Sequence, residues 1–176
     1  MAKHTEESFE ATIVDQMKTN GWRESNHQDD DRVRCMMPEE VYEFILATQP
    51  KEWEKLHAVQ GSDAKESLLQ RIYSEVSGRG TIAVLRKGVE HLGCHFKLCY
   101  FPPSSGLNED SGRLFESNIL TVVRQLRFST NNEKSIDLVL FVNGLPIFTS
   151  ELKNPLTGQD VYDAVLQYKN DRNPKG

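Results

Sequence analysis

The chain has 176 residues, of which 38% are hydrophobic and 27% are charged. That length allows one compact domain with a single core and no need for disulfides. The net charge of −5 argues against an autonomous DNA-binding module, which would usually be basic. The negative charge lies in residues 1–60, where 13 acidic and seven basic side chains give −6, whereas residues 61–176 carry +1.

Targeting signals and disulfides are not expected. No apolar run approaches the length of a membrane span, and the N-terminus does not resemble a signal peptide. The three cysteines are odd in number and lack CxxC spacing, which predicts reduced thiols and a cytoplasmic protein.

The first half of the chain predicts mostly helices. Ser8 is the expected cap of a first helix that ends at Asn20-Gly21 and carries an apolar stripe of Phe9, Ile13 and Met17. Residues 24–34 are polar and predict a loop; its acidic run, Asp29-Asp30-Asp31, is alternatively a metal site. Pro38 and Pro50 mark the first turns of two short helices, and another helix is expected near 63–77, stopping at Gly78-Arg79-Gly80.

The second half predicts strands near 81–86, 94–101 and 119–128, a loop over 102–113 and a helix over 159–170. Four side chains in the middle could be imagined as a zinc cluster: His91, Cys94, His95 and Cys99. Strand alternation over 94–101 would scatter these ligands over two faces, which favours a plain strand.

The segment from Ser135 to Lys153 is the most informative. Two apolar strands are joined by Asn143-Gly144, a strong hairpin signal. If the loop is centred near Gly144, antiparallel pairing places Asp137 about opposite Glu151. Lys153 then shares a face with Glu151, because strand side chains alternate. Two carboxylates and an ammonium are therefore expected to converge at the end of the hairpin.

These residue types suit Mg2+-dependent hydrolysis of a phosphodiester. Mg2+ takes oxygen ligands and needs only one or two carboxylates from the protein, here Asp137 and Glu151. The bound ion lowers the pKa of a water, and Lys153 could orient that water or stabilise charge. The other interpretation is a solvated strand face. The apolar character of both strands on both faces argues against it, since buried carboxylates must be paired or metal-bound.

Longer strings make a family resemblance specific. Asp137 with Glu151-Leu-Lys153 matches the PD-(D/E)xK nuclease pattern. Further matching strings are Arg124-Gln-Leu-Arg-Phe-Ser129, Glu151-Leu-Lys-Asn-Pro155 and Gln167-Tyr-Lys-Asn-Asp-Arg172. Together they resemble the N-terminal nuclease domain of type I restriction enzyme R subunits, over about residues 8 to 174.

The resemblance implies further site residues. Nucleases of this fold often complete the metal site with a glutamate on the first core helix, which corresponds to Glu10; otherwise Glu10 is a surface acid near a helix N-terminus. Gln167 matches a glutamine on the helix after the active strand, whereas the adjacent Tyr168 departs from the family spacing and is assigned to packing or DNA contact. Candidate phosphate contacts, or else solvated strand ends, are Arg86, Arg124, Arg127 and Lys134.

The resemblance implies an α/β fold (α+β, mixed sheet) with a restriction-endonuclease-like core of about five strands flanked by helices. Residues 1–80 are expected to form its N-terminal helical region with the first core helix, and residues 81–176 the nuclease sheet and active-site helix.

The implied function is that of a type I site-specific deoxyribonuclease. It would act on double-stranded DNA beside methyltransferase and specificity subunits, without a membrane. No Walker A sequence is present, so ATP hydrolysis is expected in a helicase-like motor beyond this piece. The alternative is a catalytically inactive nuclease-like domain for docking or DNA binding.

Overall fold

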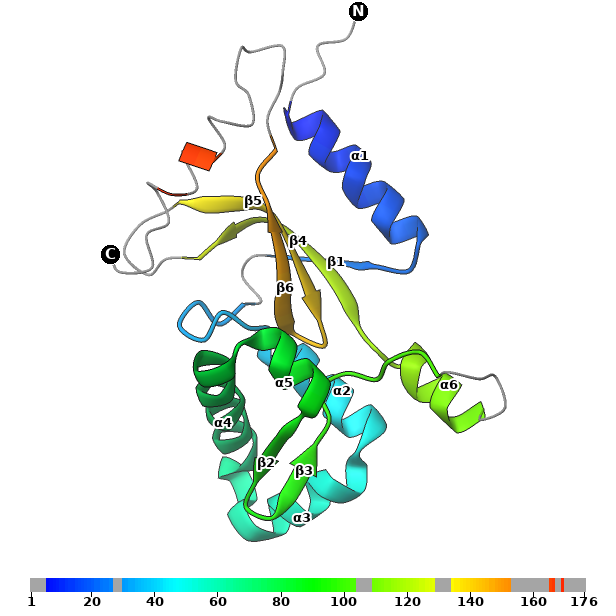
Figure 1. Ribbon diagram of the computed structural model, residues 1–176, viewed down its shortest axis with the longest axis vertical. Coiled ribbons are helices and arrows are strands. Elements are labelled where there is room, and N and C mark those ends of the chain that lie inside the picture. The colour runs from blue at the N-terminus through cyan, green and yellow to red at the C-terminus, as the bar shows by residue number, and fades with distance from the viewer. Residues whose placement is uncertain are drawn as a thin grey trace, which may run out of the picture.

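The computed structural model describes residues 6–26, 30–103, 109–128, 134–152, 165–166 and 169. Within these ranges the chain forms a sheet covered by one helix and a lower lobe of helices and a small hairpin (Figure 1). The helices are α1 (Glu6–Thr19), α2 (Pro38–Thr48), α3 (Pro50–Gln60), α4 (Ala64–Arg79), α5 (Thr81–Lys87) and α6 (Glu109–Glu116). The strands are β1 (Arg23–Ser25), β2 (Val89–His91), β3 (Cys94–Phe96), β4 (Leu120–Arg127), β5 (Ser135–Val142) and β6 (Leu145–Ser150).

The main sheet is mixed, which confirms the expected α/β class. Its four described strands have the order β1-β4-β5-β6, with β1 parallel to β4 and the other neighbours antiparallel. β2 and β3 form a separate antiparallel pair in the lower lobe. The central strands β4 and β5 are apolar on both faces. One face packs in a cluster with Val123, Val139 and Phe141, and the other packs under α1 with Val122 and Leu138.

The turn between β5 and β6 is buried and joins the sheet to the lower lobe. Asn143 and Gly144 have φ of 50° and 79°, as a type I′ turn requires, so the predicted hairpin is confirmed. The Asn143 side chain accepts from the Ile119 amide at 2.7 Å and donates to the Leu98 carbonyl at 2.9 Å. A Cβ on Gly144 would lie 2.5 Å from the Met37 carbonyl oxygen, so only glycine fits there.

The lower lobe has its own core, and its helices were largely predictable. α2 and α3 begin at the two prolines, and α4 covers the expected segment and ends at Gly80. Phe44, Leu56, Ile72 and Phe96 are fully buried in this core, which lies between the helices and the β2–β3 hairpin.

Residues 81–86 were wrongly predicted as a strand, because they lie in α5. The segment is a short apolar run, and periodicity cannot distinguish helix from strand in such a run. The glycines on either side of the segment favour the helix. Gly80 and Gly88 have φ of 82° and 71°, and the Gly88 amide donates to the Val84 carbonyl, which closes the helix.

The neighbouring predictions were too coarse. Of residues 94–101 only Cys94–Phe96 form a strand. The expected loop 102–113 contains the start of α6, an exposed helix in which Gly112 and Ser111 masked the helical signal. The expected helix over 159–170 lies outside the described residues except for Val165, Leu166 and Lys169, which are helical.

The N-terminal predictions also need correction. Ser8 lies inside α1 and is not its cap, and Phe9 is 52% exposed whereas Val14 is buried against the sheet. The expected loop 24–34 includes part of β1, a three-residue strand too short for its period to be read. Asp31 is occupied in a turn, where its Oδ1 accepts the amides of Val33 and Arg34.

Candidate functional site

Asp137 lies near the start of β5, where the hairpin opens away from the lower lobe. The observed pair Leu138–Ser150 places Glu151 opposite Asp137 one step further on. A β-bulge between Leu140 and Phe141 is responsible, because a two-residue turn without it would have paired Asp137 with Ser150. Asp137 Oδ2 accepts a hydrogen bond from the backbone amide of Leu152 at 2.7 Å, so this carboxylate links β5 to the segment that follows β6.

Glu10 reaches the same region from α1 and is only 3% exposed. Its Oε1 accepts Arg124 Nε at 2.5 Å, and its Oε2 accepts Gln125 Nε2 at 3.1 Å. The interpretation of Glu10 as a surface acid is therefore excluded. A buried carboxylate needs such partners, since an unpaired one would be costly.

Gln125 connects the carboxylates of Glu10 and Asp137. Its Nε2 also donates to Asp137 Oδ1 at 3.2 Å, and its Oε1 accepts the Ser135 hydroxyl at 2.8 Å. Because Ser135 occupies the amide oxygen, the amide NH2 is directed at Glu10 and Asp137. The chain from Arg124 through Glu10 and Gln125 to Asp137 is here called the acid network.

The backbone at Gln125 makes this reach possible. Gln125 has φ of 49°, in the left-handed region that non-glycine residues rarely adopt. Its neighbours pack to opposite sides: Arg124 pairs with Glu10 under α1, whereas Leu126 belongs to the cluster on the other face. This local distortion leaves the pairing with β5 in register.

The pairing with Glu10 determines the electrostatics of Arg124. The hydrogen bond to Glu10 raises the pKa of the Arg124 guanidinium above its ordinary value, against the opposing effect of partial burial. Arg124 therefore holds a carboxylate in this structure. Its predicted contact with phosphate would require it to leave Glu10.

The other predicted site residues are divided between two regions. Glu151 is half-buried directly after β6, Arg127 ends β4 opposite Ser135, and Lys134 is exposed just before β5. Arg86 lies on α5 in the lower lobe, away from Asp137. Lys153, Gln167 and Tyr168 fall outside the described residues.

The donor set around Asp137 suits a hard cation. Among the described residues no group of three His, Cys, Asp or Glu side chains is placed to hold a metal, and this applies also to the imagined zinc cluster. Mg2+ does not need such a group, since one or two carboxylates and waters suffice. Asp137 and Glu151 supply oxygen ligands of that kind.

Gln125 and Ser135 were missed by the sequence analysis. Gln125 is the residue of β4 that faces Asp137 across the sheet, between the observed pairs Arg124–Leu138 and Leu126–Ile136. Pairing β4 with β5 from the sequence could have placed it there, but its side-chain direction depends on a left-handed backbone that the sequence does not signal.

The helices and the mixed sheet agree with an α+β nuclease-like fold. The family model described as "Type I restriction enzyme R protein N terminus" matches residues 3–176. The chain therefore belongs to the family of type I restriction enzyme R protein N-terminal regions. Searches among curated proteins and among solved structures returned no match.

The remaining features concern the cysteines and the possibility of a membrane-spanning helix. Cys35, Cys94 and Cys99 are all free thiols, as their spacing predicted. Within the described ranges, no helix has both the length and the hydropathy that crossing a bilayer requires.

Proposed function

We propose that this chain is a Mg2+-dependent DNA endonuclease domain of a type I restriction R subunit. The observation that carries the proposal is the position of Asp137 opposite Glu151 at the open end of the hairpin, with Glu10 two hydrogen bonds away through Gln125. Membership of the R protein family supplies the context in which such acids would cut DNA.

In this proposal Asp137 and Glu151 would hold the metal. When bound there, Mg2+ would supply a water of lowered pKa and positive charge against the scissile phosphate. The Leu152 amide and Gln125 hold the Asp137 carboxylate in one orientation, which keeps the ligand in place before the ion arrives. Lys153 would orient the attacking water or stabilise charge on the phosphate, and Gln167 would assist from the following helix.

The domain would depend on partners for its substrate. Residues 61–176 carry a net charge of only +1, too little to hold duplex DNA tightly. Methyltransferase and specificity subunits would recognise the sequence, and an ATP-driven motor would translocate foreign, unmethylated DNA before cleavage.

The second candidate is a nuclease-like domain that docks or binds DNA without cutting it. The ion pair between Arg124 and Glu10 favours it, because a cation already neutralises one of the acids. Activity of the assembled enzyme decides between the two candidates.

The test is cleavage of supercoiled plasmid by the assembled complex, comparing wild type, Asp137→Ala and Asp110→Ala. Asp110 is a matched exposed acid, paired with Arg113 on α6. We expect Asp137→Ala to lose cleavage by about a hundred- to a thousandfold, as removal of a catalytic electrostatic group commonly does, and Asp110→Ala to cut normally. Full cleavage by Asp137→Ala would rule the proposal out.

A further inference from the structure

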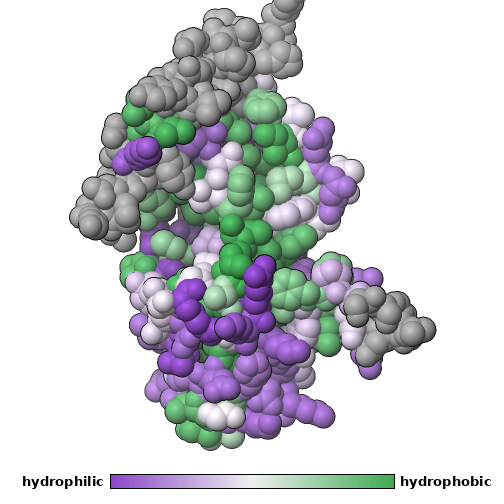
Figure 2. Space-filling model, viewed as in Figure 1, coloured by the Kyte–Doolittle hydropathy of each residue, from purple (hydrophilic) through white to green (hydrophobic). Residues whose placement is uncertain are grey.

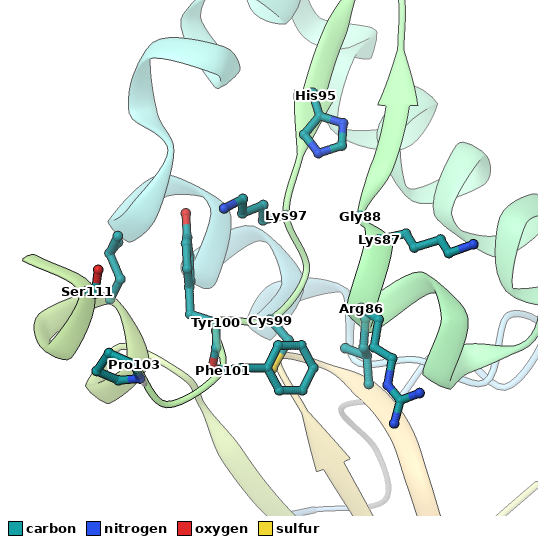
Figure 3. A pocket seen from close by; sticks show the side chains of 12 residues that line it. Arg86, Lys87, Gly88, His95, Lys97, Cys99, Tyr100, Phe101, Pro103 and Ser111 are labelled. Carbon is teal, nitrogen blue, oxygen red and sulfur yellow. The ribbon is translucent and has the colours of Figure 1, made fainter. Parts of the chain in front are cut away.

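A cavity of about 510 Å³ lies in the lower lobe, between the end of α5, the segment after β3 and α6 (Figure 3). Its lining includes the basic side chains of Arg86, Lys87, His95 and Lys97 and no acidic residue of the described chain. Its volume falls within the usual range for ligand pockets, roughly 300–1,000 Å³. Figure 2 shows that hydrophilic side chains gather over this lobe.

The wall of the cavity is held rigidly. The Lys97 amide donates to Gln49 Oε1 at 2.7 Å, and Gln49 Nε2 donates to the Lys97 carbonyl at 2.9 Å. Asn118 clamps Tyr100 in the same way, accepting its amide at 3.1 Å and donating to its carbonyl at 2.6 Å. Two side-chain amides thus fix the backbone from which the side chains of this segment project, and such a wall loses little entropy on binding.

Aromatic and cationic side chains both line the cavity. Lys97 Nζ lies 5.4 Å from the centre of the Tyr100 ring, and Phe101 is 55% exposed. In Figure 3 the Phe101 ring lies between Tyr100 and Arg86, whereas Lys87 extends away from them. An exposed ring and basic side chains in the lining of one cavity are the combination that binds bases and phosphates of a single strand.

Among the described residues Arg86 and Lys97 form no ion pair, although Lys97 lies over the Tyr100 ring. The nearby acids have other partners: Glu52 binds Lys55, Asp110 binds Arg113, and Glu90 lies 4.0 Å from His95. Arg86 and Lys87 in the last turn of α5 also complement its helix dipole, but that role does not account for Lys97 or for the exposed Phe101.

We propose that this cavity binds a single strand of nucleic acid, with a base stacked on Phe101 and with Arg86 and Lys97, which lie on opposite sides of that ring, each binding a different phosphate of the backbone (Figure 3). A concave pocket favours a single strand over a duplex, in which the bases remain stacked inside the helix. The site is separate from the acid network: Asn143, which donates to the Leu98 carbonyl and to Asn118, lies six residues beyond Asp137, roughly 20 Å along the strand. The proposal does not rest on DNA cleavage.

The test is the affinity of the chain for a labelled oligothymidylate strand, measured by fluorescence anisotropy without divalent ions. Arg86→Ala, Lys97→Ala and Phe101→Ala are each expected to weaken binding about tenfold, within the range measured for base stacking on aromatic side chains. In the two charge variants, the slope of log affinity against log salt concentration should also become shallower by about 0.7 for each phosphate that is no longer neutralised. Lys51→Ala is the matched control, because it removes the same charge from an exposed lysine of α3 that does not line the cavity, and it should weaken binding less than about threefold.

Two further measurements separate the outcomes. Asp137→Ala should bind the strand as wild type does, which would hold even if the proposed nuclease function failed. The variants at Arg86, Lys97, Phe101 and Lys51 alter exposed side chains, and unchanged melting curves for every variant would exclude misfolding. Equal losses for Lys51→Ala and Arg86→Ala, unchanged binding by Phe101→Ala, or tighter binding of a duplex of the same length would overturn the proposal.

Discussion

Gln125 holds two carboxylates with one amide group, and it does so from a strained backbone. A left-handed conformation costs a non-glycine residue about 1–2 kcal/mol. The hydrogen bonds to Glu10 and Asp137 offset this cost, because without them the buried Glu10 would keep only Arg124. Strain kept at such a position is typical of functional sites.

Replacing Gln125 by leucine tests this balance. Gln125→Leu keeps the size of the side chain but removes the donor from both carboxylates, so the free energy of unfolding should fall by about 1–3 kcal/mol in urea. Gln70→Leu, an exposed glutamine on α4, is the control and should change stability by less than about 0.5 kcal/mol. Equal effects of the two variants would show that the acid network does not stabilise the fold.

At the scale of elements, the β5–β6 hairpin could be predicted and α5 could not. The Asn143-Gly144 pair specifies its own turn, and alternating burial follows from it. The register at Asp137 depends on the register shift between Leu140 and Phe141, and Pro146 opposite Phe141 does not by itself distinguish a bulge from an edge strand. Residues 81–87 carry no helical period long enough to read, so the flanking glycines and tertiary packing decide their structure.

The buried turn gives a sharp stability prediction. Gly144→Ala places a Cβ 2.5 Å from the Met37 carbonyl oxygen at a φ of 79°, whereas Gly21 has φ of 88° and nothing within 4 Å of a Cβ. Gly21→Ala should therefore cost only the conformational strain, about 1 kcal/mol, and Gly144→Ala at least about 2 kcal/mol more. Urea unfolding of both variants measures the difference, and equal costs would contradict the tight docking of the turn on α2.

The contact between His91 on β2 and Ser67 on α4 predicts that the stability of the fold depends on pH. Burial, aided by the charge of Arg71, lowers the pKa of His91 below its ordinary value of 6.5, and its Nε2 lies 2.6 Å from the Ser67 hydroxyl. The unfolded chain therefore binds more protons, so this contribution to stability is complete above about pH 6.5 and is lost as the pH falls through the folded pKa. Thermal melts from about pH 8 to about pH 5 should show a shallower decline for His91→Gln than for wild type; parallel declines would contradict it.

At the scale of the whole molecule, the two ends of the sheet have different partners. The turn end is fixed to the helical lobe, and the open end carries Asp137 and Glu151. Pairing predicted that Asp137 and Glu151 lie at the same end of the hairpin. It could not predict that Arg124 would neutralise Glu10, because that contact joins residues 114 positions apart.

The proposed role of Lys153 predicts that DNA cleavage can be separated from ATP hydrolysis in the assembled restriction enzyme. Lys153→Ala should abolish DNA cleavage but leave ATP hydrolysis and DNA translocation near wild-type rates, because the proposed role of Lys153 is confined to the scissile phosphate. Cleavage and translocation assays on the same preparation measure both. Loss of both activities in a well-folded subunit would make Lys153 a structural or coupling residue.

Calorimetric titration of the chain with Mg2+ and Mn2+ measures whether Asp137 and Glu151 bind a metal ion. Asp137→Asn keeps the shape of the side chain and an acceptor for the Leu152 amide, but removes the charge. We expect wild type and the control Asp110→Asn to bind the metal alike, and Asp137→Asn to bind at least about tenfold more weakly. Metal binding that is equal in all three proteins, or absent from all three, would contradict a metal site at Asp137 and Glu151.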